Sequence, residues 1–160
     1  VHCTLARRMT IPPTPTEQIH ATCVAVDGIG VLIRGPSGSG KSDLALRLID
    51  GGAELVSDDR VDLTRTDGSL SAAPPAPLVG LMEVRGMGIM QRGFVDQANV
   101  RVVIDLRPTA EIERLPEPAE AEVCGVRLMV FHIDPFTVSA VAKVRLAVNM
   151  VSGSIIRTND

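Results

Sequence analysis

A glycine-rich segment in the first third of the chain constrains the fold more than any other feature. It reads GPSGSGKS and comprises Gly35, Pro36, Ser37, Gly38, Ser39, Gly40, Lys41 and Ser42. Such a loop suits a polyphosphate, because its glycines let backbone N–H groups turn toward phosphate oxygens with no side chain in the way. The lysine can reach the β- and γ-phosphates, and the serine hydroxyl can ligate Mg²⁺. The segment therefore predicts a site for a nucleotide or similar polyphosphate with Mg²⁺, in preference to a plain glycine-rich turn.

The sequence on either side of this loop has the order that a P-loop requires, which is strand, loop and helix. Residues 20–26 and 30–34 are apolar runs separated by a turn at Asp27-Gly28, and they predict a hairpin that leads into the loop. After the loop, apolar residues recur at helical spacing as far as Ile49, and Gly51-Gly52 supplies a stop.

The rest of the chain predicts an α/β fold with a mixed sheet, because several strands are joined by hairpins. We expect strands at 54–57, 61–64, 81–85, 100–106 and 126–133, a helix at 141–151, a proline-rich connection at 73–77 and an exposed acidic loop at 116–122. Residues 1–18 are predicted to be a leader, since the three prolines between positions 12 and 15 exclude a helix or a central strand. Residues 19–160 are then expected to form a single domain.

Composition excludes several classes of function. The net charge of -3 and the absence of a Lys/Arg run argue against nucleic-acid binding, and an aromatic content of 2%, with no Trp or Tyr, predicts that base-stacking platforms are absent. No apolar stretch approaches the roughly 20 residues that span a bilayer, and no signal peptide is evident, so we expect a cytoplasmic protein without a membrane partner. The three cysteines (Cys3, Cys23 and Cys124) have spacings that suit neither a disulfide framework nor a zinc site.

Two adjacent carboxylates, Asp58 and Asp59, follow the predicted strand at 54–57. P-loop enzymes commonly hold Mg²⁺ with an acidic residue at the end of an apolar strand. Neighbouring residues at a strand end point in different directions, so one carboxylate can address the metal and the other an acceptor hydroxyl. The pair also fits a turn or a helix cap, and the P-loop alone does not distinguish a kinase from a hydrolytic switch or a motor.

Four segments in order resemble the catalytic domain of the HPr kinase/phosphorylase family. They are His20, the loop from Gly35 to Ser42, residues 55–61 (LVSDDRV) and residues 81–89 (LMEVRGMGI). The last is similar to the family's Glu-Ile-Arg-Gly-Leu-Gly-Ile signature. The resemblance runs from about Ile19 to near the C-terminus. It implies a P-loop kinase core of the HPr kinase and phosphoenolpyruvate carboxykinase-like type, in a compact form that lacks the family's N-terminal domain.

The resemblance also implies an activity, which is the phosphorylation of a serine on the phosphocarrier HPr. The donor would be ATP or pyrophosphate with Mg²⁺, inorganic phosphate would reverse the reaction, and the assembly would be a homohexamer. Implied catalytic residues are Asp59 as acid/base, His20, Lys41 and Arg114, and implied Mg²⁺ ligands are Ser42 and Glu83. The segment that the family links to dephosphorylation falls at 140–145, where its usual Pro and Gly are missing.

Two other functions fit the same residues. A small-molecule P-loop kinase would also use a carboxylate to activate a hydroxyl. A nucleotide-binding regulatory module without catalysis would bind ATP but not turn it over. Labelled ATP with purified HPr separates the three functions, because only a protein kinase labels a protein.

Overall fold

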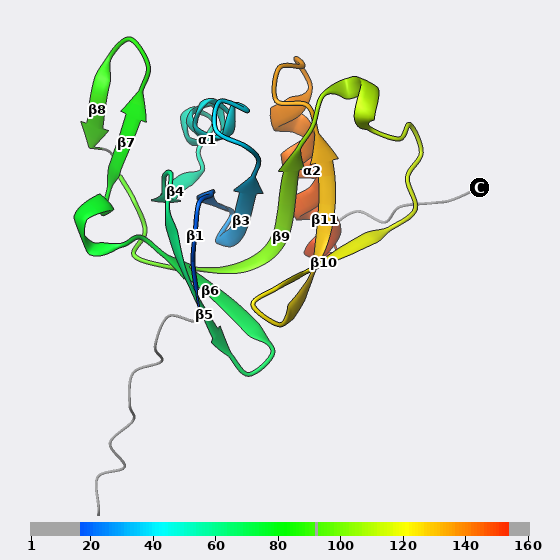
Figure 1. The fold of residues 1–160 in the computed structure, drawn as a ribbon, viewed down its shortest axis with the longest axis horizontal. Helices are drawn as coiled ribbons and strands as arrows, with labels where there is room; N and C mark the ends of the chain where they lie inside the picture. Colours follow the sequence, from blue (N-terminus) through cyan, green and yellow to red (C-terminus); the bar gives the residue numbers. More distant parts are fainter. Residues whose placement is uncertain (1–16, 92, 154–160) are drawn as a thin grey trace, which may run out of the picture.

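The computed structural model describes residues 17–91 and 93–153, and Figure 1 shows its ribbon. Two of its strands form a hairpin whose side chains are mostly buried. Strand β2 (Thr22–Val26) pairs antiparallel with β3 (Ile29–Arg34). Asp27 and Gly28 both have positive φ, as a two-residue hairpin turn of the primed type requires. The predicted hairpin is confirmed, except that β2 begins at Thr22 and leaves His20 outside the strand.

The hairpin lies inside a curled mixed sheet with the strand order β1-β5-β6-β9-β3-β2-β4. The other members of this path are β1 (Glu17–Ile19), β4 (Glu54–Ser57), β5 (Val61–Thr66), β6 (Ser69–Ala73) and β9 (Ala98–Leu106). The first half of β9 pairs antiparallel with β6, and its second half pairs parallel with β11 (Val126–Ile133). Because β9 shares one edge between two partners, the sheet curls. The predicted mixed sheet is confirmed.

Four strands end at the same edge of this sheet. Strand β9 is parallel to β3 and to β11, and β4 is antiparallel to β2, which is itself antiparallel to β3. The carboxyl ends of β4, β3, β9 and β11 therefore meet at one edge, which is where ligands bind in open α/β sheets.

Alternating side chains of the central hairpin divide between two apolar cores. Val24 and Ile33 face one core, which is completed by α1 (Lys41–Asp50) and α2 (Ala140–Val151). Cys23 and Leu32 face the other, which β5, β6 and β11 help to enclose. Because both faces of β2 and β3 are buried, the P-loop that follows β3 rests on a rigid base. Among the described residues, no helix is long and apolar enough to cross a membrane.

Four features of the chain differ from the expectation. The predicted acidic loop at 116–122 contains a strand, β10 (Ala119–Val123), because β11 offers it an antiparallel partner. A separate hairpin of β7 (Leu81–Val84) and β8 (Gly88–Gln91) carries residues 81–89, and β8 was not predicted. Short 3₁₀ helices occur at η1 (Ala76–Leu78) and η2 (Thr109–Glu111). Residues 17 and 18, expected in the leader, belong to β1, and the prolines at 12–15 lie outside the described residues.

Candidate functional site

The glycine-rich loop connects the end of β3 to the start of α1, and the backbone conformation of the loop explains two of its glycines. Gly40 has a φ of 98°, and a Cβ there would lie 3.1 Å from Pro135 Cγ and 3.3 Å from Phe136 Cζ. Gly38 has a φ of 80° and lines the adjoining cavity. Both positions favour glycine, because an L side chain rarely adopts this left-handed conformation.

Helix α1 directs its N-terminus at the cavity without a side-chain cap. Its N-cap residue is Gly40, whose carbonyl accepts the first intrahelical bond from Leu44 N at 3.0 Å. The N–H groups of the first turn of a helix have no intrahelical partner, and the helix dipole makes this end positive. The loop and the helix together therefore form an anion site.

Lys41 is buried, and its ammonium is held by the loop itself. Its Nζ donates to the carbonyls of Gly35 at 2.7 Å and Pro36 at 3.0 Å. Burial lowers the pKa of Lys41, and the nearby carboxylates of Asp59 and Asp58 partly oppose this effect. A buried cation whose hydrogen bonds go to neutral carbonyls gains when an anionic phosphate arrives.

Asp58 is buried and joins three elements. Its Oδ1 accepts a hydrogen bond from Ser42 Oγ at 2.7 Å and from Thr22 Oγ1 at 3.1 Å. Thr22 is 0% exposed, so its hydroxyl needs such a partner. The sequence analysis did not single out Thr22, although a polar residue at the start of an otherwise apolar buried strand is a signal for it.

Asp59 points the other way, toward His20. Its Oδ1 lies 2.6 Å from His20 Nε2, and the two side chains are 63% and 51% exposed. Asp59 has a φ of 70°, in the left-handed region that Asp tolerates better than most residues. The turn that closes with Arg60 N donating to Asp58 O at 2.8 Å drives the two carboxylates apart. The prediction that they diverge is confirmed.

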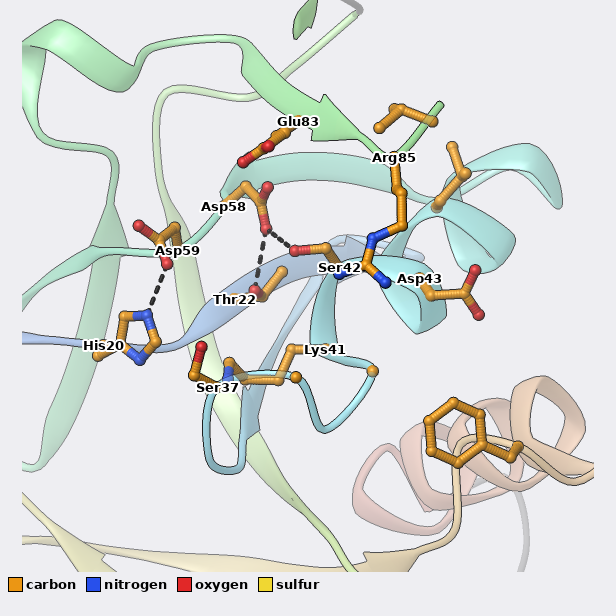
Figure 2. Close-up of a pocket in the computed structure, with 15 residues that line it drawn as sticks. His20, Thr22, Ser37, Lys41, Ser42, Asp43, Asp58, Asp59, Glu83 and Arg85 are labelled. Atoms are coloured by element: carbon orange, nitrogen blue, oxygen red, sulfur yellow. Dashed lines mark hydrogen bonds and ion pairs between the residues drawn. The ribbon is translucent and has the colours of Figure 1, made fainter. Parts of the chain in front are cut away.

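One cavity of about 630 Å³ brings most of the predicted site together. Figure 2 shows His20 and Asp59 at one end, Asp43 and Arg85 at the other, and Ser42 and Lys41 between them. Glu83, on β7, turns its carboxylate toward the side where Asp58 lies (Figure 2). The complete lining is His20, Thr22, Ser37, Gly38, Gly40, Lys41, Ser42, Asp43, Leu46, Asp58, Asp59, Glu83, Val84, Arg85 and Phe136. Its size falls within the range of roughly 300–1,000 Å³ that is typical of ligand pockets.

Arg114 does not line this cavity. It is exposed in the segment that follows η2, and neighbouring residues of that segment border a second cavity between β11 and α2. The separation arises because the chain leaves the site after β9 and returns along β10 and β11. Gly35, Pro36 and Ser39 form the back of the loop rather than the cavity wall.

The oxygen groups beside the P-loop fit Mg²⁺. Ser42 Oγ and Asp58 Oδ1 are already adjacent, and Glu83 lines the same cavity. Among the described residues there is no group of three or more His, Cys, Asp or Glu that could hold a metal alone. Mg²⁺ is commonly bound by one or two carboxylates together with waters and substrate phosphates, so this sparse set of hard oxygen ligands suits it.

Comparisons with known proteins agree with this geometry. Residues 13–152 match the family model described as the HPr Serine kinase C-terminal domain. An HPr kinase/phosphorylase of Clostridium botulinum is 47% identical over 76 residues, which are 48% of this chain and 25% of the relative. One from Clostridium kluyveri is 44% identical over 86 residues, 54% of this chain and 28% of the relative. These matches thus span about a quarter of the relatives' length.

A solved structure is similar over a larger share of the chain. The Hpr(Ser) kinase/phosphatase from Coxiella burnetii matches with a TM-score of 0.73 and 28% sequence identity. The match covers 86% of this chain and 99% of that chain. The likeness therefore extends over most of this chain and nearly all of that one.

Proposed function

The chain belongs to the HPr serine kinase C-terminal domain family, and on that premise we propose that it transfers the γ-phosphoryl group of ATP to a serine of HPr or an HPr-like carrier. One observation carries the proposal. A single cavity joins a P-loop with Mg²⁺-type oxygen ligands to a separate, accessible carboxylate that is hydrogen-bonded to a histidine.

The donor half of the reaction belongs to the P-loop, Ser42, Asp58 and Glu83. The loop N–H groups, the positive end of α1 and Lys41 hold and neutralise the phosphates. Ser42, Asp58 and Glu83 are the residues that would hold Mg²⁺, which when bound would neutralise charge on the phosphates. Thr22 keeps the Asp58 carboxylate aimed at Ser42 through its own hydrogen bond.

The acceptor half belongs to Asp59 and His20. With His20 Nε2–H donating to Asp59 Oδ1, the second oxygen of Asp59 is left to accept the serine proton as the Oγ–P bond forms. In the reverse direction the protonated Asp59 returns its proton to the serine Oγ while inorganic phosphate attacks the phosphoserine. That attack breaks the Oγ–P bond and yields pyrophosphate. His20 is a positioning residue for Asp59.

The openness of the acceptor end favours a protein substrate over a small molecule. Asp59 and His20 are more than half exposed, so a serine on a protein surface can reach them. Met87 and Ile89, on the β7–β8 hairpin that carries Glu83, are 72% and 71% exposed and offer apolar contact area. A kinase for a small metabolite would instead be expected to enclose its acceptor.

The assembly, its location and the role of Arg114 are further parts of the proposal. Family resemblance supports a cytoplasmic homohexamer in which Arg114 acts in phosphotransfer. Arg114 does not line the cavity of its own chain, so such a role would be played at the cavity of another subunit. Sedimentation velocity tests the hexamer. Mixing Arg114→Ala chains with Asp59→Asn chains tests shared sites by recovery of activity.

The decisive experiment combines γ-labelled ATP, Mg²⁺ and an HPr-type carrier with its serine intact or replaced by alanine. We expect label on the intact carrier only, and its loss with release of pyrophosphate when inorganic phosphate is added. Labelled pyrophosphate in place of ATP tests the second donor. Label on a metabolite alone would favour a small-molecule kinase, and ATP binding without transfer would favour a regulatory module.

A further inference from the structure

Phe136 differs from the other two aromatic residues of the chain. The sequence contains three Phe and no Trp or Tyr. Phe94 and Phe131 are partly buried against the core beside α1 and α2, whereas Phe136 is 75% exposed and lines the cavity of the P-loop. An aromatic ring exposed at the wall of a ligand site gains apolar burial only when a ligand group packs against it. Phe136 is therefore a candidate contact for the ligand.

The topology places Phe136 on the side of the P-loop away from the reacting carboxylate. Asp59 follows β4, which lies two strands from β3 on one side, and Phe136 follows β11, which lies two strands from β3 on the other. A phosphate chain with its terminal group at Asp59 and its body on Lys41 and Ser42 continues past the first turn of α1. The group attached to that chain then arrives beside Phe136, whose Cζ is 3.3 Å from the Cβ position of Gly40.

The residues just before the ring are held by hydrogen bonds to two other parts of the chain. Asp134 Oδ1 accepts a bond from Phe136 N at 3.0 Å, and Asp134 Oδ2 accepts bonds from Thr109 N at 3.0 Å and Thr109 Oγ1 at 2.7 Å. Arg47 of α1 donates to the carbonyl of Pro135 and pairs with Asp43 at 3.1 Å. These bonds tie the turn after β11 to the P-loop helix, so the ring is positioned before a ligand binds.

We propose that Phe136 is the stacking platform for the nucleobase of the phosphoryl donor, so that this cavity takes nucleoside triphosphates in preference to polyphosphates without a nucleoside. Stacking does not distinguish one base from another, because every base has a π-face. ATP and GTP should therefore bind with similar affinity. The inference rests on the proposed function for the phosphate site. It adds a contact for the nucleobase, which the P-loop cannot recognise.

Calorimetry with Mg²⁺ and either ATP or inorganic tripolyphosphate tests the platform without requiring catalysis. We expect Phe136→Ala to raise the dissociation constant of ATP about tenfold, within the range for loss of one base–aromatic stack, and to leave that of tripolyphosphate unchanged. Phe136→Tyr should retain the affinity for ATP. Val138→Ala is the matched control, because Val138 is in the same turn, is fully exposed and does not line the cavity.

The other outcomes separate this inference from the proposed function. If wild type binds tripolyphosphate as tightly as ATP, the platform is wrong and the phosphate site stands. If Phe136→Ala weakens both ligands equally, the ring only shapes the P-loop, and the platform is again wrong. If it leaves ATP unchanged but raises the KM of the protein acceptor, Phe136 contacts the acceptor instead. If wild type binds neither ligand, the proposed function itself fails.

Discussion

Asp58 and Asp59 are neighbours in the chain and opposites in the structure. Asp58 is 5% exposed and accepts hydrogen bonds from two hydroxyls on two different elements. Asp59 has a side chain that is 63% exposed, and within residues 17–91 and 93–153 its one hydrogen-bond partner is His20, which is itself half exposed. A left-handed backbone at Asp59 produces the contrast, because it turns the second carboxylate out as the first turns in.

This difference separates a carboxylate that stabilises the fold from one that is available for chemistry. A buried carboxylate that satisfies buried donors is part of the folded framework, and its removal leaves unpaired groups behind. An exposed carboxylate contributes little to folding, and a protein substrate can reach it. The same dipeptide therefore fixes the donor side and supplies the acceptor side of the proposed reaction.

Replacing the exposed carboxylate should have the largest effect of all. Asp59→Asn removes the proposed base while keeping side-chain shape and tolerance of the left-handed backbone. We expect the rate of phosphoryl transfer to fall about 10³-fold, within the usual range for general-base catalysis. Because Asp59 is exposed, ATP affinity and melting temperature should stay near wild type. A variant that retains strong transfer, or that unfolds, would contradict the assignment.

Replacing the buried carboxylate, unlike replacing Asp59, should lower the stability of the fold. Asp58→Ala leaves the Thr22 hydroxyl buried without its partner, and we expect a loss of about 1–3 kcal/mol in the free energy of unfolding. Adding Thr22→Val removes that unpaired hydroxyl and should restore part of the loss. Urea unfolding of the two single variants and the double variant measures the coupling. Additive effects would contradict a shared role for Thr22 and Asp58.

The contrast between the two carboxylates was only partly predictable from sequence. The strand, the loop and the helix followed from apolar periodicity and glycine spacing, which are local signals. The sequence also predicted that Asp58 and Asp59 diverge, but from strand geometry, whereas the structure turns them apart after β4 has ended, through the left-handed backbone at Asp59. Thr22 was not predicted as the partner of Asp58, because their hydrogen bond joins residues 36 positions apart.

Long-range pairing explains the other differences. Strand β10 forms because β11 is beside it, although residues 116–122 have the composition of an acidic loop. Phe136 reaches the P-loop because β11 is parallel to β9 and β9 to β3, a register that no single segment encodes. Arg114, which the family resemblance implies as a catalytic residue, does not line the cavity, because the chain between β9 and β10 leads away from that site.

His20 should show an intermediate effect. It contacts Asp59 at 2.6 Å but does not have to touch the transferred group, so it positions the base. We expect His20→Ala to lower the rate of transfer about tenfold. This effect is smaller than the loss of a general base itself, which costs at least about a hundredfold. His20→Gln, which can still donate to Asp59, should recover part of the rate. Melting temperature should remain unchanged in both variants, and a rate equal to wild type in His20→Ala would remove His20 from the mechanism.

Asp134 extends the comparison, because it combines hydrogen bonds like those of Asp58 with a partly exposed position, between the buried Asp58 and the exposed Asp59. The Thr109 hydroxyl and the backbone N–H of Phe136 hold the pKa of Asp134 below its ordinary value of 3.8. A carboxyl whose pKa is lower in the folded state stabilises the fold above pH 3.8, and that stabilisation is lost as the pH falls through the folded-state pKa. Thr109→Val removes the largest cause, so an NMR titration should show the pKa of Asp134 rising toward 3.8, with melting at pH 7 little altered. A large loss of melting temperature at pH 7 would mean that hydrogen bonding makes a carboxylate part of the framework even when it is only partly buried. The distinction drawn between Asp58 and Asp59 would then need another cause.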